Sequence, residues 1–201
     1  GLQGEVVNDT RGQVRRLSED EKANLMAGRN PDGTEKDTAP PEAPADSPWL
    51  AEGIVSSFDD AALLADYKRA VGYMSKGNAR TARPTLVQLA DAGADKGWAE
   101  PVAALLCDAK ASVGEVAESR RSIEEFRVAW PSSSHMATIV VAEGKALMHE
   151  GKRARAPGQK RNSPPSAEQA ELYRQAIARW DEAISKWPAD PAVADAYLNK
   201  S

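Results

Sequence analysis

The fold is decided by the stretch Ala176-Ile177-Ala178-Arg179-Trp180-Asp181-Glu182-Ala183-Ile184-Ser185-Lys186-Trp187-Pro188, which is followed at once by Ala189-Asp190-Pro191. Its apolar residues recur every three or four positions, which is the spacing of an amphipathic helix. Pro188 cannot continue the helix because it lacks a backbone N–H, and a second helix is expected to begin just after it. The stretch therefore predicts two consecutive helices joined by a short turn.

The same unit occurs earlier in the chain. Offsets of four, three and five residues are shared by Ala82-Leu86-Leu89-Ala94, Ser119-Ile123-Phe126-Pro131 and Ala176-Trp180-Ala183-Pro188. The first two segments lie 37 residues apart, and the third lies 57 residues further on, which equals 37 plus an insertion of 20. Three glycines, Gly77, Gly114 and Gly151, also recur every 37 residues. Each is expected to form the turn inside a helical hairpin, where φ is positive.

These repeats predict an all-α protein of about three stacked helical hairpins, at residues 58–93, 98–130 and 134–187, with a partial repeat at 190–201. A lone hairpin cannot bury its apolar stripe, and about three are needed for a continuous core. The third hairpin contains the basic insertion 152–165, after which a capping box is expected at Ser166. Four tryptophans near hairpin boundaries are expected to be packing residues: Trp98, Trp130, Trp180 and Trp187.

Upstream of the repeats the chain has a different character. Residues 1–28 are expected to form an N-terminal arm with a short helix, and residues 29–57 a proline-rich extended linker. Residues 1–48 carry ten acids against six bases, so the net charge of −4 is concentrated there. Near the end of the linker, Trp49 and Leu50 are costly to leave in water. We expect them to dock on the chain's own first helices as a cap, and the alternative is an anchor for another protein.

The repeat resembles the tetratricopeptide repeat (TPR), in which a small residue, an aromatic four on, alanine three on and proline five on precede a new helix. The first-helix pattern of that family is similar to Gly144, Leu147 and Gly151. The resemblance covers about residues 58–201 and implies a right-handed solenoid. The chain departs from the family in its period of 37 residues, where the family has about 34. It also departs at Ala94, where proline is expected, and at Ala70 and Cys107, which replace the paired first-helix glycine.

The resemblance implies that the first helix of each hairpin lines a concave groove that holds a partner. Carried over by register, the candidate partner-binding residues of this groove are Tyr67, Val71, Met74, Asp108, Lys145, Met148 and His149, with Asp195 and Asn199 further along. The Lys/Asn set with which some members grip a terminal carboxylate is not matched, because Tyr67 and Val71 stand there. A mixed apolar and polar groove suits an extended segment or a helix of another protein.

A second candidate surface is the insertion. Its candidate partner-binding residues are Lys152, Arg153, Arg155, Lys160 and Arg161, with no acid between them. Three interpretations stay open for it: a solvated loop, contact with an acidic protein surface, and contact with nucleic acid. The third is the least favoured because no aromatic residues are interleaved for base stacking.

The sequence contains no recognisable catalytic, metal or cofactor motif. Its one cysteine, Cys107, leaves no partner for an intramolecular disulfide and lies in an apolar helical run, as a buried thiol would. His135 and His149 fall at opposite ends of one predicted helix, about 21 Å apart at about 1.5 Å per residue, so they cannot share a metal. No apolar run approaches the roughly 18–20 residues that span a bilayer.

Together these features predict a non-catalytic protein–protein interaction scaffold, acting as a subunit or accessory factor of a larger complex, without cofactor, metal or small-molecule substrate. One alternative is a nucleic-acid-associated regulator that uses the basic loop 152–161. Another is a structural subunit that binds through its N-terminal arm. Ala/Arg-rich usage suits a bacterial protein. Resemblance to envelope-assembly repeat proteins favours the periplasm over the cytoplasm.

Overall fold

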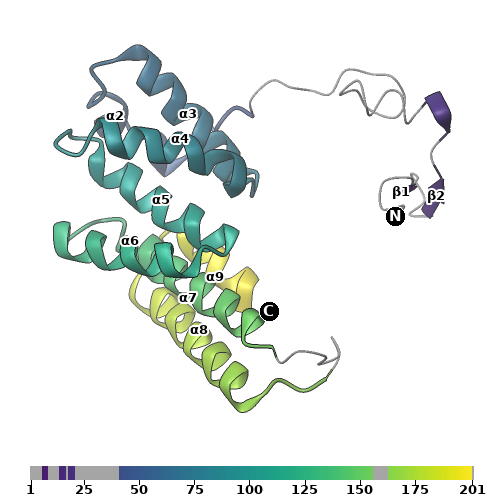
Figure 1. The fold of residues 1–201 in the computed structure, drawn as a ribbon. Helices are drawn as coiled ribbons and strands as arrows, with labels where there is room; N and C mark the ends of the chain where they lie inside the picture. Colours follow the sequence, from purple (N-terminus) through teal and green to yellow (C-terminus); the bar gives the residue numbers. More distant parts are fainter. Residues whose placement is uncertain (1–5, 9–13, 17, 21–40, 156–162, 201) are drawn as a thin grey trace. The chain divides into compact units, whose positions relative to one another are not determined.

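The computed structural model describes residues 6–8, 14–16, 18–20, 41–155 and 163–200, and it divides the chain into two units, residues 1–40 and 41–201 (Figure 1). In the first unit, strands β1 (Val6–Asn8) and β2 (Val14–Arg16) pair antiparallel, with Val6 opposite Arg16. The sequence suggested a short strand or turn at residues 5–7 but did not predict a second strand to pair with it. Residues 21–40, and with them much of the expected linker, lie outside the described residues.

The second unit is α-helical throughout its described residues, which confirms the predicted all-α class for this unit. Its elements are the 3-10 helix η1 (Pro48–Leu50) and the α-helices α2 (Glu52–Val55), α3 (Ala61–Ser75), α4 (Ala79–Ala92), α5 (Ala99–Val113), α6 (Val116–Ala129), α7 (Met136–Arg153), α8 (Ala167–Lys186) and α9 (Ala192–Lys200). Side chains that accept hydrogen bonds from free N–H groups start three of the long helices, among them α4, which Asn78 caps. Asp60 caps α3, and Ser166 with Gln169 forms the predicted capping box of α8.

Helices that are consecutive in the chain pack against each other from α3 to α9, and α7 also contacts both α5 and α9 (Figure 1). Three buried clusters lie between them. The first joins α3, α4 and α5, the second joins α5, α6 and α7, and the third joins α7, α8 and α9. Each cluster therefore links one pair of helices to the first helix of the next pair, as a core shared between neighbours requires.

The repeated positions of the sequence point into these clusters. All nine are 0–3% exposed: Ala82, Leu86, Leu89, Ser119, Ile123, Phe126, Ala176, Trp180 and Ala183. Trp98 and Trp180 are fully buried, in agreement with the packing role expected of them, whereas Trp130 and Trp187 are half-buried. The shared offsets therefore identified the buried face of α4, α6 and α8.

The structure differs from the sequence prediction at two places. Positive φ angles occur at Gly77 (70°) and Gly114 (80°), but Gly151 lies inside α7, which continues to Arg153. A Cβ at Gly151 would lie 2.5 Å from Cε1 of Tyr173, so close packing against α8 explains this glycine. The second difference is the end of the expected extended linker. Residues 48–55 form η1 and α2 instead, with backbone hydrogen bonds such as Leu50 N–H to the Ser47 carbonyl, 2.9 Å.

Candidate functional site

A pocket of about 220 Å³ lies between the odd-numbered helices. The helices contribute Val71 and Met74 of α3, Leu105 and Asp108 of α5, Thr138 and Val141 of α7, and Ala192 and Asp195 of α9. Ser47, Pro48 and Trp49, which precede the repeats, complete the lining together with Ser75 and Pro191. The pocket thus combines an apolar surface with two carboxylates.

A second pocket, of about 240 Å³, shares Asp195 with the first. Its other lining residues are Ser112, Lys145, Met148, His149, Lys152, Leu198 and Asn199. We refer to the two pockets together as the groove. It is formed by four helices that are far apart in the sequence, because the pairwise packing of the chain places α5, α7 and α9 side by side.

Six of the seven residues predicted for the groove line it: Val71, Met74 and Asp108 in the first pocket, and Lys145, Met148 and His149 in the second. Asp195 and Asn199 line it as well. Tyr67 differs from the prediction, because its ring is fully buried in the first cluster. Its hydroxyl donates to the carbonyl of Trp49 at 2.9 Å, so it supports the segment before the repeats rather than the open groove.

Lys145 lies between the two carboxylates of the groove, Asp108 and Asp195. Its Nζ lies 2.8 Å from Oδ1 of Asp108 and 2.7 Å from Oδ2 of Asp195, and its side chain is 12% exposed. Burial by itself lowers the pKa of Lys145, but the two carboxylates outweigh this effect and the pKa is raised. The ammonium therefore stays charged and ties α5, α7 and α9 together at one point.

The end of the groove near the turn between α5 and α6 is basic. His149 is hydrogen-bonded to the backbone of Ser112, and its pKa is lowered by burial and by the charges of Lys152 and Arg153. Arg153 donates to the carbonyl of Gly114. Lys152 is exposed and forms no ion pair with any residue that the structure describes. Glu150, on the same helix turn, is already paired with Arg120, so Lys152 contributes positive charge to this corner.

The predicted basic loop is only partly described. Lys152 and Arg153 are the last residues of α7 rather than part of a loop, and Arg155 is exposed just after it. Lys160 and Arg161 lie outside the described residues. The groove and the start of the insertion therefore meet at the C-terminal end of α7. From the sequence they were predicted as two separate surfaces.

Trp49 and Leu50 pack on the chain's own helices, which is the docked arrangement expected for them. Leu50 contacts the first cluster and Trp49 contacts both the first and the second. The ring of Trp49 stacks on His135 with centroids 4.7 Å apart and planes inclined by 18°. Burial lowers the pKa of His135, so the imidazole under Trp49 is neutral over most of the physiological range.

The described residues contain no group of three or more His, Cys, Asp or Glu side chains placed to hold a metal ion. Cys107 is buried, which raises the pKa of its thiol to about 12 and keeps it protonated and unreactive. Among the helices described, none combines the length and the apolar character needed to cross a membrane.

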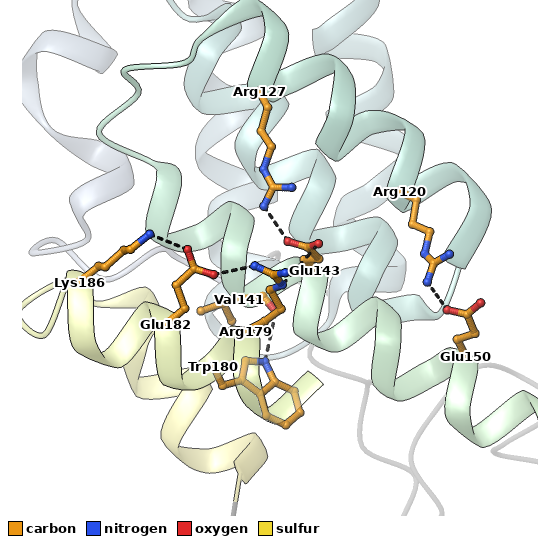
Figure 2. Close-up of polar contacts among 9 residues, drawn as sticks. All are labelled: Arg120, Arg127, Val141, Glu143, Glu150, Arg179, Trp180, Glu182 and Lys186. Atoms are coloured by element: carbon orange, nitrogen blue, oxygen red, sulfur yellow. Dashed lines mark hydrogen bonds and ion pairs between the residues drawn. The ribbon is translucent and has the colours of Figure 1, made fainter. Parts of the chain in front are cut away.

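A larger pocket of about 420 Å³ on α6, α7 and α8 was missed by the sequence analysis. Figure 2 shows its charged side chains: Arg127 donates to Glu143 at 2.6 Å, and Arg179 lies between Glu143 and Glu182, 2.7 Å from the latter. Arg120 pairs with Glu150 in the same way. The signal was available, because both the arginines and the glutamates are seven residues apart, which places each pair on one helix face. Because four of its five charged side chains take part in these ion pairs, we interpret this pocket as a junction between helices.

Comparison of the chain with family models, with curated proteins and with solved structures gives no match in any of the three. The residues of the groove are therefore the basis on which a function can be assigned.

Proposed function

We propose that the chain is a non-catalytic protein–protein interaction scaffold built of TPR-like hairpins in a solenoid, acting as a subunit or accessory factor of a larger complex. The observation that supports this most directly is the groove. Helices α3, α5, α7 and α9 contribute side chains to two pockets that share Asp195. An elongated site that spans four helices suits a segment of another protein, which can make many weak contacts along its length.

The lining of the groove favours a polypeptide as its ligand. Val71, Leu105 and Met148 supply apolar surface, while polar groups such as Asn199 and Lys152 remain at the rim. Apolar contact of this kind provides affinity, and the placed charges select the partner. The charge changes along the groove, from the carboxylates of the first pocket to the basic corner of the second. We therefore expect a partner segment with acidic side chains at the end that lies over Lys152.

A catalytic role is less well supported by the same residues. The imidazole of His149 is hydrogen-bonded to backbone, and Lys145 is held by two carboxylates. No hydrogen bond joins either side chain to a hydroxyl or thiol of the described groove residues, and such a pair is the geometric requirement of nucleophilic catalysis. The groove therefore offers contacts rather than a reaction centre.

The test is an affinity capture with the full chain and two variants, in cell extract of the source organism. Met148→Glu places a charge on the apolar surface of the groove. Val128→Glu is the matched control, because Val128 is 82% exposed on α6 and lies outside both pockets. We expect the same proteins to be captured by the unchanged chain and by Val128→Glu, and to be lost with Met148→Glu. Capture by all three alike would show that the groove is not the binding site.

The nucleic-acid alternative is separated in the same experiment by salt and nuclease. Binding through phosphates weakens steeply as salt is raised, with a slope that follows the number of contacts. A protein partner held in an apolar groove should persist from about 50 to 200 mM salt and after nuclease treatment. Loss of every captured protein on nuclease treatment would favour the nucleic-acid regulator instead.

A further inference from the structure

The segment Pro41–Leu50, which we call the strap, precedes the repeats and lies on the odd-numbered helices. It touches them mainly near its two ends. Pro41 and Ala43 lie against α3 at Gly72, and Trp49 and Leu50 pack on the first cluster. Ser47, Pro48 and Trp49 line the first pocket of the groove together with side chains of α3, α5, α7 and α9. The strap therefore covers part of α3 and forms one wall of the first pocket.

Gly72 provides the first attachment point. It lies in the interior of α3, where glycine costs helix stability and so calls for a packing reason. A Cβ at this position would lie 1.9 Å from the carbonyl oxygen of Pro41 and 3.2 Å from the backbone nitrogen of Ala43. The backbone of the strap thus runs directly over the backbone of α3, in a notch that any larger residue would fill.

Trp49 provides the second attachment point. Its ring stacks on His135 at the start of α7, and its carbonyl accepts the hydroxyl proton of Tyr67 in α3 at 2.9 Å. These contacts reach from the first hairpin to the third. Trp49, through its ring and its carbonyl, thereby bridges α3 and the start of α7 beside the first pocket.

Between these points the strap is weakly held. Glu42, Pro44, Ala45, Asp46 and Pro48 are exposed. Among the described residues, the strap forms one hydrogen bond to the helices, which the Tyr67 hydroxyl donates. Its other hydrogen bonds, such as the one from the Ser47 N–H to the Pro44 carbonyl, join residues close in sequence. Proline has no N–H to satisfy, so a proline-rich segment can leave a surface without stranding backbone donors. Within the part of the chain that the structure describes, release of the strap would break one hydrogen bond to the helices and separate Trp49 and Leu50 from the clusters.

We propose that the surface of α3 and of the start of α7 under the strap, which adjoins the first pocket of the groove, binds extended, proline-containing segments that carry an aromatic anchor, and that the strap is its resident occupant, which a partner's segment of the same kind displaces. This rests on the proposed function and names the chemistry of the partner at that site. The strap itself shows that the notch at Gly72 accepts bare backbone, that His135 accepts an indole ring stacked on it, and that the Tyr67 hydroxyl binds a backbone carbonyl. A tethered occupant competes at an effective concentration on the order of millimolar, so a partner must bind well or arrive in a large complex.

The probe is a labelled peptide with the sequence of residues 41–51, titrated with the full chain and followed by fluorescence anisotropy. Trp49→Ala weakens the strap in the chain and leaves the notch open. We expect the peptide to bind Trp49→Ala at least tenfold more tightly than the unchanged chain, and a peptide with its tryptophan replaced by alanine to bind neither. The double variant Trp49→Ala/Gly72→Ala fills the notch with a methyl group. It should lose at least tenfold of the binding gained.

A second variant, Tyr67→Phe, keeps the proposal testable if Trp49→Ala fails to fold. Tyr67→Phe keeps the buried ring and removes the hydroxyl that holds the strap, so it should bind the peptide more tightly than the unchanged chain but less tightly than Trp49→Ala. Circular dichroism shows that each variant remains helical. Equal binding to the unchanged chain and to both variants, or binding to none of them, overturns the proposal. If that happens while Met148→Glu still loses its captured proteins, the strap proposal is wrong and the scaffold function stands.

Discussion

Trp98 and Trp180 both fill the core of the helical unit, at opposite ends of it, but different kinds of residues cover them. Both are fully buried, and each ring fits against a glycine, Gly93 for Trp98 and Gly144 for Trp180. The indole N–H of Trp180 donates to the carbonyl of Val141 at 3.3 Å (Figure 2). The indole N–H of Trp98 has no hydrogen-bond partner among the described residues.

The covering of the two rings explains the difference. Trp180 is enclosed by α7, α8 and α9, all of which belong to the repeats. Trp98 stacks instead on Phe58, with centroids 4.7 Å apart and planes inclined by 5°, and Phe58 lies before the first long helix. The core around Trp180 is thus completed by residues of the repeats, whereas the core around Trp98 is completed by a residue that lies outside them. Substitutions at the paired positions test how far this difference extends into stability.

The largest effect is expected from removing either ring. Trp98→Ala and Trp180→Ala should each lower the free energy of unfolding by about 3–5 kcal/mol, because each leaves a large cavity in a packed core. Urea denaturation measures both, with Val128→Ala as a control that should stay within about 0.5 kcal/mol. A loss below about 1 kcal/mol for one ring would mean that the surrounding helices collapse into the space at that end.

Raising the pH should lower the free energy of unfolding through titrating side chains in the first and second clusters, because the buried residues of the third cluster do not titrate. Cys107 lies in the second cluster, and burial raises its pKa from 9.0 to about 12, while burial also raises the pKa of Tyr67 in the first. Between pH 9.0 and about pH 12, the thiol of Cys107 has lost its proton in the unfolded chain but keeps it in the folded chain. Stability therefore falls as pH rises, by about 1.4 kcal/mol per pH unit for one group, from about pH 9 to about pH 12.

The control for this pH dependence is Cys107→Ala, which removes the titrating thiol. Its unfolding free energy should fall less steeply over the same pH range, by up to that same amount per unit. The residues of the third cluster, such as Val140 and Trp180, do not titrate. An unchanged slope in Cys107→Ala would show that the thiol is accessible enough to ionise in the folded state.

The comparison of the two ends also shows what the sequence could predict. The offsets shared by α4, α6 and α8 identified nine buried positions, because a repeated helix must bury the same face each time. The register also placed six of seven candidate residues in the groove. The first result depends only on helical periodicity, which is a local property of the chain, whereas the groove residues were carried over from the resemblance to the tetratricopeptide repeat.

Features that depend on contacts between distant segments were not predictable in this way. Gly151 has the same spacing as Gly77 and Gly114, yet it packs against Tyr173 instead of forming a turn. Gly72 gave no signal that the strap would cross it, because its partner Pro41 lies 31 residues earlier in an irregular segment. Tyr67 was assigned to the open groove because register alone cannot show that another segment lies on top of it.

Intermediate effects are expected where the two glycines meet the rings. A Cβ at Gly144 would lie 2.2 Å from Nε1 of Trp180, and a Cβ at Gly93 would lie 2.0 Å from Cη2 of Trp98. Gly144→Ala and Gly93→Ala should therefore each cost about 1–3 kcal/mol by overpacking. Gly53→Ala is the control, because no atom lies within 4 Å of the added methyl group. Thermal or urea unfolding of the three variants checks this, and a stabilised Gly144→Ala would show that the ring of Trp180 can shift.

The smallest effect isolates the one hydrogen bond that distinguishes the two rings. Replacing either tryptophan with phenylalanine removes similar volume, so the cavity cost is comparable at the two ends. Trp180→Phe also loses the bond to Val141, worth about 0.5–1.5 kcal/mol, whereas Trp98→Phe removes a buried N–H that has no described partner and so relieves a cost. Trp180→Phe should therefore be the more destabilising by about 1 kcal/mol or more in urea denaturation. Equal losses would mean that the Trp98 indole N–H is satisfied in solution, most simply by water, and that the two ends of the core differ in covering but not in energy.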